Sequence, residues 1–335
     1  MRHFVVVGIL VVVVAVLTYL GLHAVGLMPV PASAQAGPID WLWDLQIKAM
    51  TFLFALIVVP MVYSLLVFRR RKGDTSDAEH IEGNTTLEIV WTIIPLFMVL
   101  GMAYIGAENL AETRRVDPDA MVVRVTGFQW GWTFDYPDYG ITSNELYLPV
   151  NKQALLKMES RDVIHSFWVP EFRVKQDLVP GRVTELRITP TIIGDTYKVR
   201  CAEMCGTSHA FMESPVVVVD KAGFDAWVSE QQALAAQAGM TPEGRGEALV
   251  AANGCAACHS IDGSARVGPT WFGLFGHEVQ LSDGTTVTAD EAYLTESILN
   301  PQAKIVAGFE NQQMPAYSFT EEQVADIIAY IKTLK

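Results

Sequence analysis

Four side chains that bind soft metal ions lie within twelve residues of one another. Cys201, Cys205, His209 and Met212 supply two thiolates, an imidazole and a thioether. Ligands of this kind together favour copper. Two cysteines at i and i+4 can bridge two metal ions within one loop, while the histidine caps one ion and the methionine ligates weakly. A pair of buried thiols is the structural alternative, and the added histidine and methionine disfavour it.

A dinuclear site of this kind needs a second histidine from another part of the chain. His165 is well placed for this role, since it lies at the end of a stretch expected to form a strand. Two bridging thiolates would spread one unpaired electron over both copper ions, so that oxidation changes the bond lengths little. The bound metals would also keep both thiols deprotonated. The residues therefore indicate a centre for one-electron transfer.

A second group of ligands lies near the C-terminal end of the chain. Cys255, Cys258 and His259 form a C-x-x-C-H motif. This motif attaches haem c, with thioether bonds from both cysteines and an axial iron bond from the histidine. Zinc-binding and redox-active C-x-x-C sites are the alternatives.

The residues around this motif favour the haem. Gly254 precedes it, and residues 267–274 are similar to the loop that packs under the haem in small cytochromes c. Met314 follows His259 by 55 residues and lies in a stretch similar to the distal methionine loop. Ligation by histidine and methionine raises the reduction potential. For Met314 the alternative is a methionine packed in the core.

Composition limits the class of protein. The chain has 335 residues and a formal net charge of −13, which argues against a nucleic-acid partner and suits a basic protein partner. All four cysteines belong to the two motifs, so none is left for a structural disulfide.

Apolar runs predict an N-terminal membrane anchor. Residues 47–68 and 89–107 are each about 20 residues long, the length that spans a bilayer. We therefore expect a transmembrane helical hairpin over residues 40–110. The two runs enclose a basic cluster, formed by Arg69, Arg70, Arg71 and Lys72. Positive loops stay in the cytoplasm, so everything after Ala107 is expected on the outer, periplasmic side.

An earlier apolar run allows two interpretations. Residues 4–28 carry no Asp, Glu, Lys or Arg, Arg2 precedes them, and an A-x-A pattern follows at Ala32 and Ala34. Residues 1–34 are therefore either a cleaved secretory signal or an extra transmembrane helix. Both interpretations place Gln35 on the outer side.

The remaining chain divides into two soluble domains. Short alternating apolar runs separated by turn residues predict an all-β domain over residues 111–220. An alanine- and glutamine-rich stretch predicts a linker helix over residues 221–240. An all-α domain is expected over residues 241–335, and its last helix has apolar residues at helical spacing. The fold class is thus a multi-domain membrane protein.

Around the copper-ligand loop the sequence resembles cytochrome c oxidase subunit II. The stretches that carry the resemblance are 127–132, 165–170, 179–182 and 201–212. Together with the two-helix hairpin they cover most of residues 40–220. The resemblance implies a cupredoxin-like domain with the dinuclear CuA centre. Phe128 departs from the pattern, because the family often has histidine there.

The resemblance also implies the role of each residue. The side-chain ligands of CuA would be His165, Cys201, Cys205, His209 and Met212. Glu203 would ligate copper through its backbone carbonyl and face, with its carboxylate, a magnesium ion shared with subunit I. Trp130 would lie where electrons enter. Glu88 would lie at the mouth of a proton channel of subunit I, although from the residues alone a solvated acid at a helix start is the simpler interpretation.

Together, these features resemble a subunit II with a fused cytochrome c domain, as in haem–copper oxidases of the caa type. Such a protein lies in the bacterial inner membrane with subunit I and subunit III. It accepts electrons at haem c, from cytochrome c or another donor, and passes them through CuA to the oxygen-reducing site of subunit I.

Three other functions fit less well. A copper chaperone would have neither the haem motif nor the His209 and Met212 pattern. The CuA domain of a nitrous oxide reductase would need a large histidine-rich domain, and the chain has seven histidines. A quinol oxidase subunit typically lacks the copper ligands.

Overall fold

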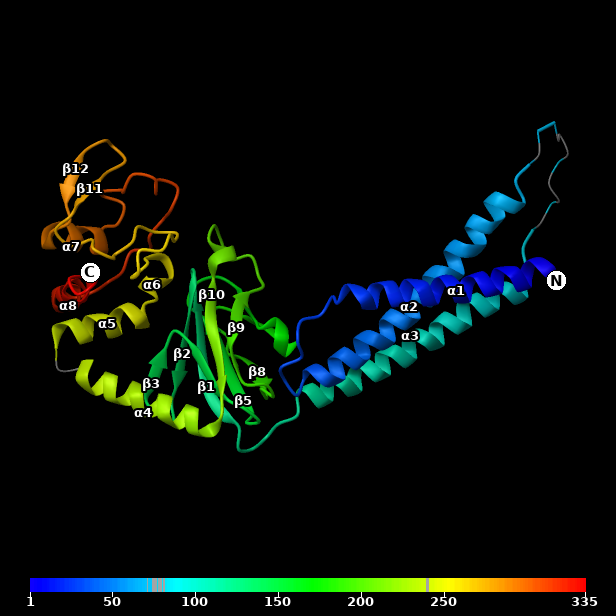
Figure 1. The fold of residues 1–335 in the computed structure, drawn as a ribbon, viewed down its shortest axis with the longest axis horizontal. Coiled ribbons are helices and arrows are strands. Elements are labelled where there is room, and N and C mark those ends of the chain that lie inside the picture. Colours follow the sequence, from blue (N-terminus) through cyan, green and yellow to red (C-terminus); the bar gives the residue numbers. More distant parts are fainter. Residues whose placement is uncertain (71, 74–76, 78–79, 81, 239–240) are drawn as a thin grey trace. The chain divides into compact units, whose positions relative to one another are not determined.

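The computed structural model describes residues 1–70, 72–73, 77, 80, 82–238 and 241–335. Arg71 of the predicted basic cluster lies outside the described residues. The chain forms two compact units, which are shown in Figure 1. The first consists of Met1–Pro31 and Gln35–Arg115, and the second of Ala32–Ala34 and Val116–Lys335.

The first unit consists of three long helices. They are α1 (Arg2–Val25), α2 (Ala36–Val67) and α3 (Thr85–Thr113). Within the described residues these are the three helices long and apolar enough to cross a membrane. The predicted hairpin corresponds to α2 and α3, both of which extend beyond the apolar runs because helical hydrogen bonding continues into their polar ends. Gly26 ends α1 in the left-handed conformation, and the side chain of Asn84 caps the start of α3.

The second unit contains a β-sandwich, which confirms the predicted all-β, cupredoxin-like domain. One five-stranded sheet has the order β3-β2-β1-β5-β8, and the other has the order β4-β10-β9-β6-β7. The strands of the first sheet are β1 (Met121–Phe128), β2 (Gly131–Tyr136), β3 (Ile141–Ser143), β5 (Ala154–Ser160) and β8 (Thr184–Ile188). Those of the second are β4 (Leu146–Pro149), β6 (His165–Trp168), β7 (Lys175–Leu178), β9 (Gly194–Cys201) and β10 (Glu213–Val219).

The alternation in the strands reflects one buried face for each sheet. In β1, Met121, Val123 and Val125 are buried and the residues between them are not fully buried. Large aromatic side chains fill the space between the sheets, and Trp132 and Phe167 are both almost completely buried. This rigid core holds the loops at the end of the sandwich.

Helix α4 (Lys221–Ala238) follows the sandwich at the position expected for a linker helix. Its first half packs into the sandwich core through Phe224, Trp227 and Val228. The Trp227 ring stacks on Tyr147, with ring centroids 4.4 Å apart. The helix is therefore joined to the β domain by a buried aromatic face.

The C-terminal part of the second unit is the helical domain that the sequence predicts. Its helices are α5 (Pro242–Ala252), α6 (Cys255–Cys258), α7 (Glu291–Leu299) and α8 (Glu321–Ile331). It also contains a two-stranded ribbon, β11 (Glu278–Gln280) with β12 (Thr286–Thr288). Helices α5 and α8 cross where Gly246 meets the backbone of Asp326, since a Cβ on this glycine would lie 1.9 Å from the Asp326 carbonyl oxygen. Arg245 donates two hydrogen bonds to the buried Asp326 carboxylate.

Candidate functional site

Strand pairing brings the two stretches with the predicted copper ligands together. His165 begins β6, Cys201 ends β9, and these strands pair with Phe167 opposite Cys201. The loop after Cys201 returns to the start of β10, where the Cys201 N–H donates to the Met212 carbonyl, 3.1 Å away. Distant parts of the sequence thus meet at one end of the second sheet.

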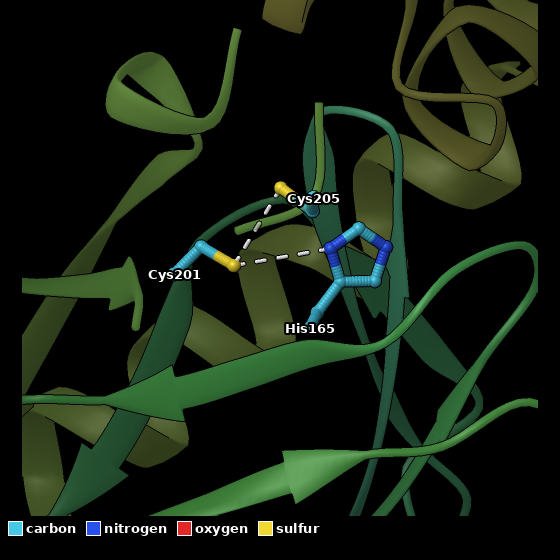
Figure 2. Close-up of side chains that lie close together, drawn as sticks. All are labelled: His165, Cys201 and Cys205. Carbon is cyan, nitrogen blue, oxygen red and sulfur yellow. Dashed lines mark hydrogen bonds between the residues drawn. The ribbon is translucent and has the colours of Figure 1, made fainter. Parts of the chain in front are cut away.

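The two thiols and the histidine form a buried cluster. The Sγ atoms of Cys201 and Cys205 are 3.7 Å apart, and Nδ1 of His165 lies 3.8 Å from the Cys201 sulfur. Figure 2 shows the three side chains converging on one another from β6, the end of β9 and the loop that follows. Their ligand atoms all lie within 4.8 Å of one another, which is close enough for shared metal ions.

The other predicted ligands surround the same sulfur atoms. The Cys205 sulfur lies 3.5 Å from Nδ1 of His209 and 3.7 Å from Sδ of Met212. The backbone carbonyl of Glu203 lies 3.2 Å from the Cys201 sulfur. Each sulfur therefore has an imidazole and one further possible metal ligand beside it. This near-symmetric set fits a pair of copper ions held between the two thiolates.

Asp162 sets the orientation of the His165 ring. Its Oδ1 lies 2.8 Å from Nε2 of His165, and its Oδ2 accepts a hydrogen bond from the Gln129 N–H at 2.7 Å. Because Nε2 is occupied, Nδ1 is the ring nitrogen that faces the sulfurs. A carboxylate in this position commonly fixes the ring of a metal-binding histidine.

The electrostatics of the metal-free cluster favour a single thiolate. Burial opposes a charge on His165, but the hydrogen bonds with Asp162 and Cys201 outweigh it and raise the pKa of His165 to about 9. The hydrogen bond with Cys205 and the nearby His165 hold the pKa of the Cys201 thiol well below its usual range. The pKa of Cys205 is raised, because its proton would leave beside that thiolate. A bound metal would remove this asymmetry by deprotonating both thiols.

Two side chains of the aromatic segment are hydrogen-bonded to a predicted ligand. Nε2 of Gln129 and Nε1 of Trp130 both donate to the backbone carbonyl of Cys205, at 2.7 and 3.2 Å. Sequence reasoning singled out Trp130 and missed Gln129. The only signal for Gln129 was its place next to Trp130 in the aromatic segment, which does not reveal a hydrogen bond to a residue so distant in the sequence.

The C-x-x-C-H motif forms a short helical turn, α6. Gly254 begins it with a left-handed φ of 66°, and the His259 N–H donates to the Cys255 carbonyl at 3.0 Å. Nδ1 of the buried His259 lies 2.7 Å from the Pro269 carbonyl and donates to it, which leaves Nε2 free to bind iron. Burial lowers the pKa of His259, so the ring is in the neutral form that a metal ligand requires.

A cavity that is open to solvent lies next to this motif. Cys255, Cys258, His259 and Met314 all line it. The ring of Trp271 stacks on His259, with centroids 4.8 Å apart, and gives the histidine a fixed orientation. Two thiols, a neutral histidine and a methionine around one largely apolar cavity fit a covalently bound haem.

Residues of the β-sandwich also line this cavity. They are Phe128, Gln129 and Trp130. The same two side chains that donate to the Cys205 carbonyl therefore border the space for the haem.

The side chains of two predicted site residues are exposed. Glu88 is exposed in the first turn of α3, in the helical unit. The Glu203 side chain is exposed, while its carbonyl faces the Cys201 sulfur. Neither carboxylate joins a group of metal ligands within the described residues.

Three stretches of the chain match known families. Residues 22–106 match "Cytochrome C oxidase subunit II, transmembrane domain", residues 141–221 match "Cytochrome C oxidase subunit II, periplasmic domain", and residues 244–335 match "Cytochrome c". These matches follow the order of the helical unit, the β-sandwich and the C-terminal helical domain. The family implies the CuA copper and haem c as cofactors, association with subunit I of the oxidase, and a membrane protein with an exposed soluble part.

Relatives extend the likeness over most of the chain. Cytochrome c oxidase subunit 2 of Alkalihalophilus pseudofirmus is 31% identical over 307 residues, which cover 88% of this chain and 88% of that protein. The subunit 2 of Thermostichus vulcanus is 34% identical over 278 residues, which cover 67% of this chain and 84% of that protein. The crystal structure of the periplasmic domain of subunit II of cytochrome oxidase from Bradyrhizobium japonicum is 32% identical and covers 35% of this chain and 97% of that chain, with a TM-score of 0.33. The chain belongs to the cytochrome c oxidase subunit II family, is a subunit of an oxidoreductase, and carries a cytochrome c domain at its C-terminal end.

Proposed function

We propose that this subunit accepts electrons at haem c and passes them through CuA to the oxygen-reducing site of subunit I. When bound, the haem and the copper pair each take up and give up one electron. The chain's own residues hold the two groups and connect them.

The proposed ligands follow from the two clusters. Copper would be held by the carbonyl of Glu203 and by the side chains of His165, Cys201, Cys205, His209 and Met212. The haem would be held by thioether bonds from Cys255 and Cys258 and by axial bonds from His259 and Met314. In His165 an acceptor engages Nε2, and in His259 an acceptor engages Nδ1. This supports ligation through Nδ1 of His165 and Nε2 of His259.

One observation carries the proposed route between the two groups. Gln129 and Trp130 line the cavity beside His259, and both donate hydrogen bonds to the carbonyl of Cys205. The haem space and a copper ligand are thus separated by single side chains. This supports electron transfer between the haem and the copper pair within the chain, with Trp130 on the route; the direction from haem to copper follows from the family resemblance.

The family resemblance supports the remaining parts of the proposal. Subunit III and a donor, cytochrome c or another reductant, would join subunit I as partners. The Glu203 carboxylate would ligate a magnesium ion shared with subunit I, and Glu88 would lie at the mouth of a proton channel. The protein would lie in the bacterial inner membrane with both soluble domains on the periplasmic side, because the basic residues Arg69, Arg70 and Lys72 follow α2.

The proposed domain limits follow the sequence pattern. They are 40–110 for the helical hairpin, 111–220 for the CuA domain, 221–240 for the linker helix and 241–335 for the cytochrome domain.

A His259→Ala variant of the oxidase complex tests the route. We expect loss of the haem c absorption bands, retention of the copper signal in electron paramagnetic resonance, and slower turnover with a protein donor. Turnover with a small reductant that reaches the copper directly should be retained. His277→Ala is the matched control, since His277 is an exposed histidine of the same domain. An unchanged rate with the protein donor would show that electrons enter at the copper centre instead.

A further inference from the structure

The segment between α1 and α2 is built into the β-sandwich. Ala32–Ala34 belongs to the soluble unit, although the residues on both sides belong to the helical unit. Ala32 is 0% exposed and Ser33 is 5% exposed. The segment forms a β-bridge between Ser33 and Pro190, and further hydrogen bonds join it to Glu171, Phe172, Thr189 and Thr191.

This segment includes the A-x-A pattern that marks signal-peptide cleavage. Cleavage after Ala34 would remove Ala32 and Ser33 from the sandwich. It would leave the Thr191 N–H without its acceptor, the Ala32 carbonyl at 2.9 Å, and the Thr189 carbonyl without the Ala34 N–H, also at 2.9 Å. Cleavage would therefore remove the buried Ala32 and Ser33 and two backbone hydrogen bonds from this edge of the sandwich.

The helix before this segment packs closely on α2. Val11 of α1 is buried together with Ala55 and Val59 of α2, and further residues of α1 extend this contact at helical spacing, namely Val7, Val14 and Ala15. Small residues at such a contact let two helices approach closely within a membrane, where apolar burial alone does not drive association.

Polar contacts join the same two helices near both ends. The Tyr19 hydroxyl donates to Asp44 at 2.7 Å, and Lys48 lies over the Tyr19 ring. At the other end Nδ1 of His3 lies 2.7 Å from the hydroxyl of Tyr63. Such specific pairs are expected between helices that stay together in the mature protein.

The length of α1 fits a spanning helix better than a signal. Secretory signals have an apolar core of about 7 to 15 residues. Helix α1 has 24 residues, which at 1.5 Å per residue is about 36 Å and crosses the apolar part of a bilayer.

We infer that residues 1–34 are retained in the mature subunit. Helix α1 is a third transmembrane helix, and Ala32–Ala34 is a structural segment of the soluble domain and not a cleavage site. With the soluble domains on the periplasmic side, as proposed above, the N-terminus would lie on the cytoplasmic side. The inference does not depend on the proposed electron route.

The N-terminus of the mature subunit tests the inference. The experiment compares the wild type with Ala34→Leu, because signal peptidase requires a small residue before the cleaved bond. Ala34 is exposed and its hydrogen bond uses the backbone, so the substitution should be tolerated. We expect intact-mass spectrometry to give subunits of the same length, and we expect both to retain the segment 1–34. A wild-type subunit that begins at Gln35, beside a variant longer by these residues, would overturn the inference.

A second comparison tests whether α1 covers α2. Ala55→Phe should weaken the subunit, because Ala55 is completely buried against α1. Leu56→Phe adds an aromatic ring at the neighbouring position, which is 46% exposed, and should have little effect. The readout is the thermal stability of the purified oxidase in detergent. Equal stability of the two variants would mean that α1 does not pack on this face.

Discussion

Two of the three proposed histidine ligands, His165 and His259, are each oriented by a single acceptor. Asp162 engages Nε2 of His165, and the carbonyl of Pro269 engages Nδ1 of His259. The acceptors are different groups and act on different ring nitrogens, but each leaves one nitrogen facing its cofactor site. At the residue scale, therefore, the partner of the histidine decides which nitrogen can bind a metal.

Removal of the Asp162 carboxylate should weaken copper binding. In Asp162→Ala the His165 ring loses the acceptor that fixes it, and the affinity for copper should fall about 10- to 100-fold. Titration of the metal-free protein with copper measures this change. Glu159→Ala is the matched control, because it removes the same charge from an exposed position three residues earlier. Equal losses in both variants would assign the effect to charge and not to the orientation of His165.

Replacement of one bridging thiolate should destroy the shared spin. Cys205→Ser removes a sulfur that lies 3.7 Å from both the Cys201 and the Met212 sulfurs. We expect the electron paramagnetic resonance pattern of two equivalent coppers to disappear while the haem c spectrum is retained. Met204→Leu changes an exposed residue of the same loop and should keep the pattern. Retention of the shared-spin pattern in Cys205→Ser would contradict the ligand assignment.

At the scale of elements, the sequence predicted what local spacing can encode. Alternating apolar residues predict an all-β domain, the length of two apolar runs predicts the spanning hairpin, and apolar residues at helical spacing predict the last helix of the cytochrome domain. Local spacing does not encode long-range pairing. The sequence therefore did not show that Ala32–Ala34 joins the sandwich, or that Trp227 stacks on Tyr147.

The candidate site shows the same limit. The loop after Cys201 and the C-x-x-C-H motif are contiguous, so their ligand patterns were visible in the sequence. Whether His165 would lie beside Cys201 depends on the register between β6 and β9, and only the structure gives this register. Asp162 orients His165, and Gln129 donates to the Cys205 carbonyl. Both contacts depend on loops that meet only in the folded chain, so no local sequence pattern predicts them.

The start of α6 should be sensitive to any side chain on Gly254. This glycine has a φ of 66°, and a Cβ there would lie 2.0 Å from the Cζ atom of Phe128. Gly254→Ala should therefore cost about 1 to 2 kcal/mol for the left-handed backbone and about 1 to 3 kcal/mol more for the overlap. Thermal unfolding followed by haem absorption measures the loss.

Two further variants separate these costs. Gly276→Ala has a similar φ of 81° with no atom within 4 Å, so it should show the backbone cost alone. In a background with Phe128→Ala, the further loss caused by Gly254→Ala should fall to the level of Gly276→Ala. If it does not fall, Phe128 does not limit the space at Gly254.

At the scale of the whole molecule, Phe128 connects the β-sandwich with the cytochrome domain. The sequence marks this residue as a departure from a position that often holds histidine. In the structure its ring lies against Gly254, and the Arg161 guanidinium lies 5.3 Å from the ring centre. Arg161 also donates to the carbonyl of Ala252, in the last turn of α5. Where the cytochrome domain meets the sandwich, this chain therefore has an apolar ring at a position that often holds a histidine in the family.

The hydrogen bonds to the Cys205 carbonyl should control transfer between the two domains. Trp130→Phe and Gln129→Leu each remove one of the two donors while keeping a side chain of similar size. We expect slower electron transfer from the haem to the copper pair in each variant, and a larger effect in the double variant, because the connection between the cavity and the copper ligand is lost stepwise. Flash reduction of the haem, followed by the rise of reduced copper, measures the rate.

The control must exclude a general effect on the copper centre. Trp168→Phe changes a partly exposed tryptophan at the end of β6 that does not line the haem cavity, and it should keep the wild-type rate. The reduction potentials of both groups, measured in the same samples, separate a lost connection from a changed driving force. A slower rate at unchanged potentials supports the connection through Gln129 and Trp130. An unchanged rate in the double variant would place the route between the haem and the copper pair elsewhere in the interface.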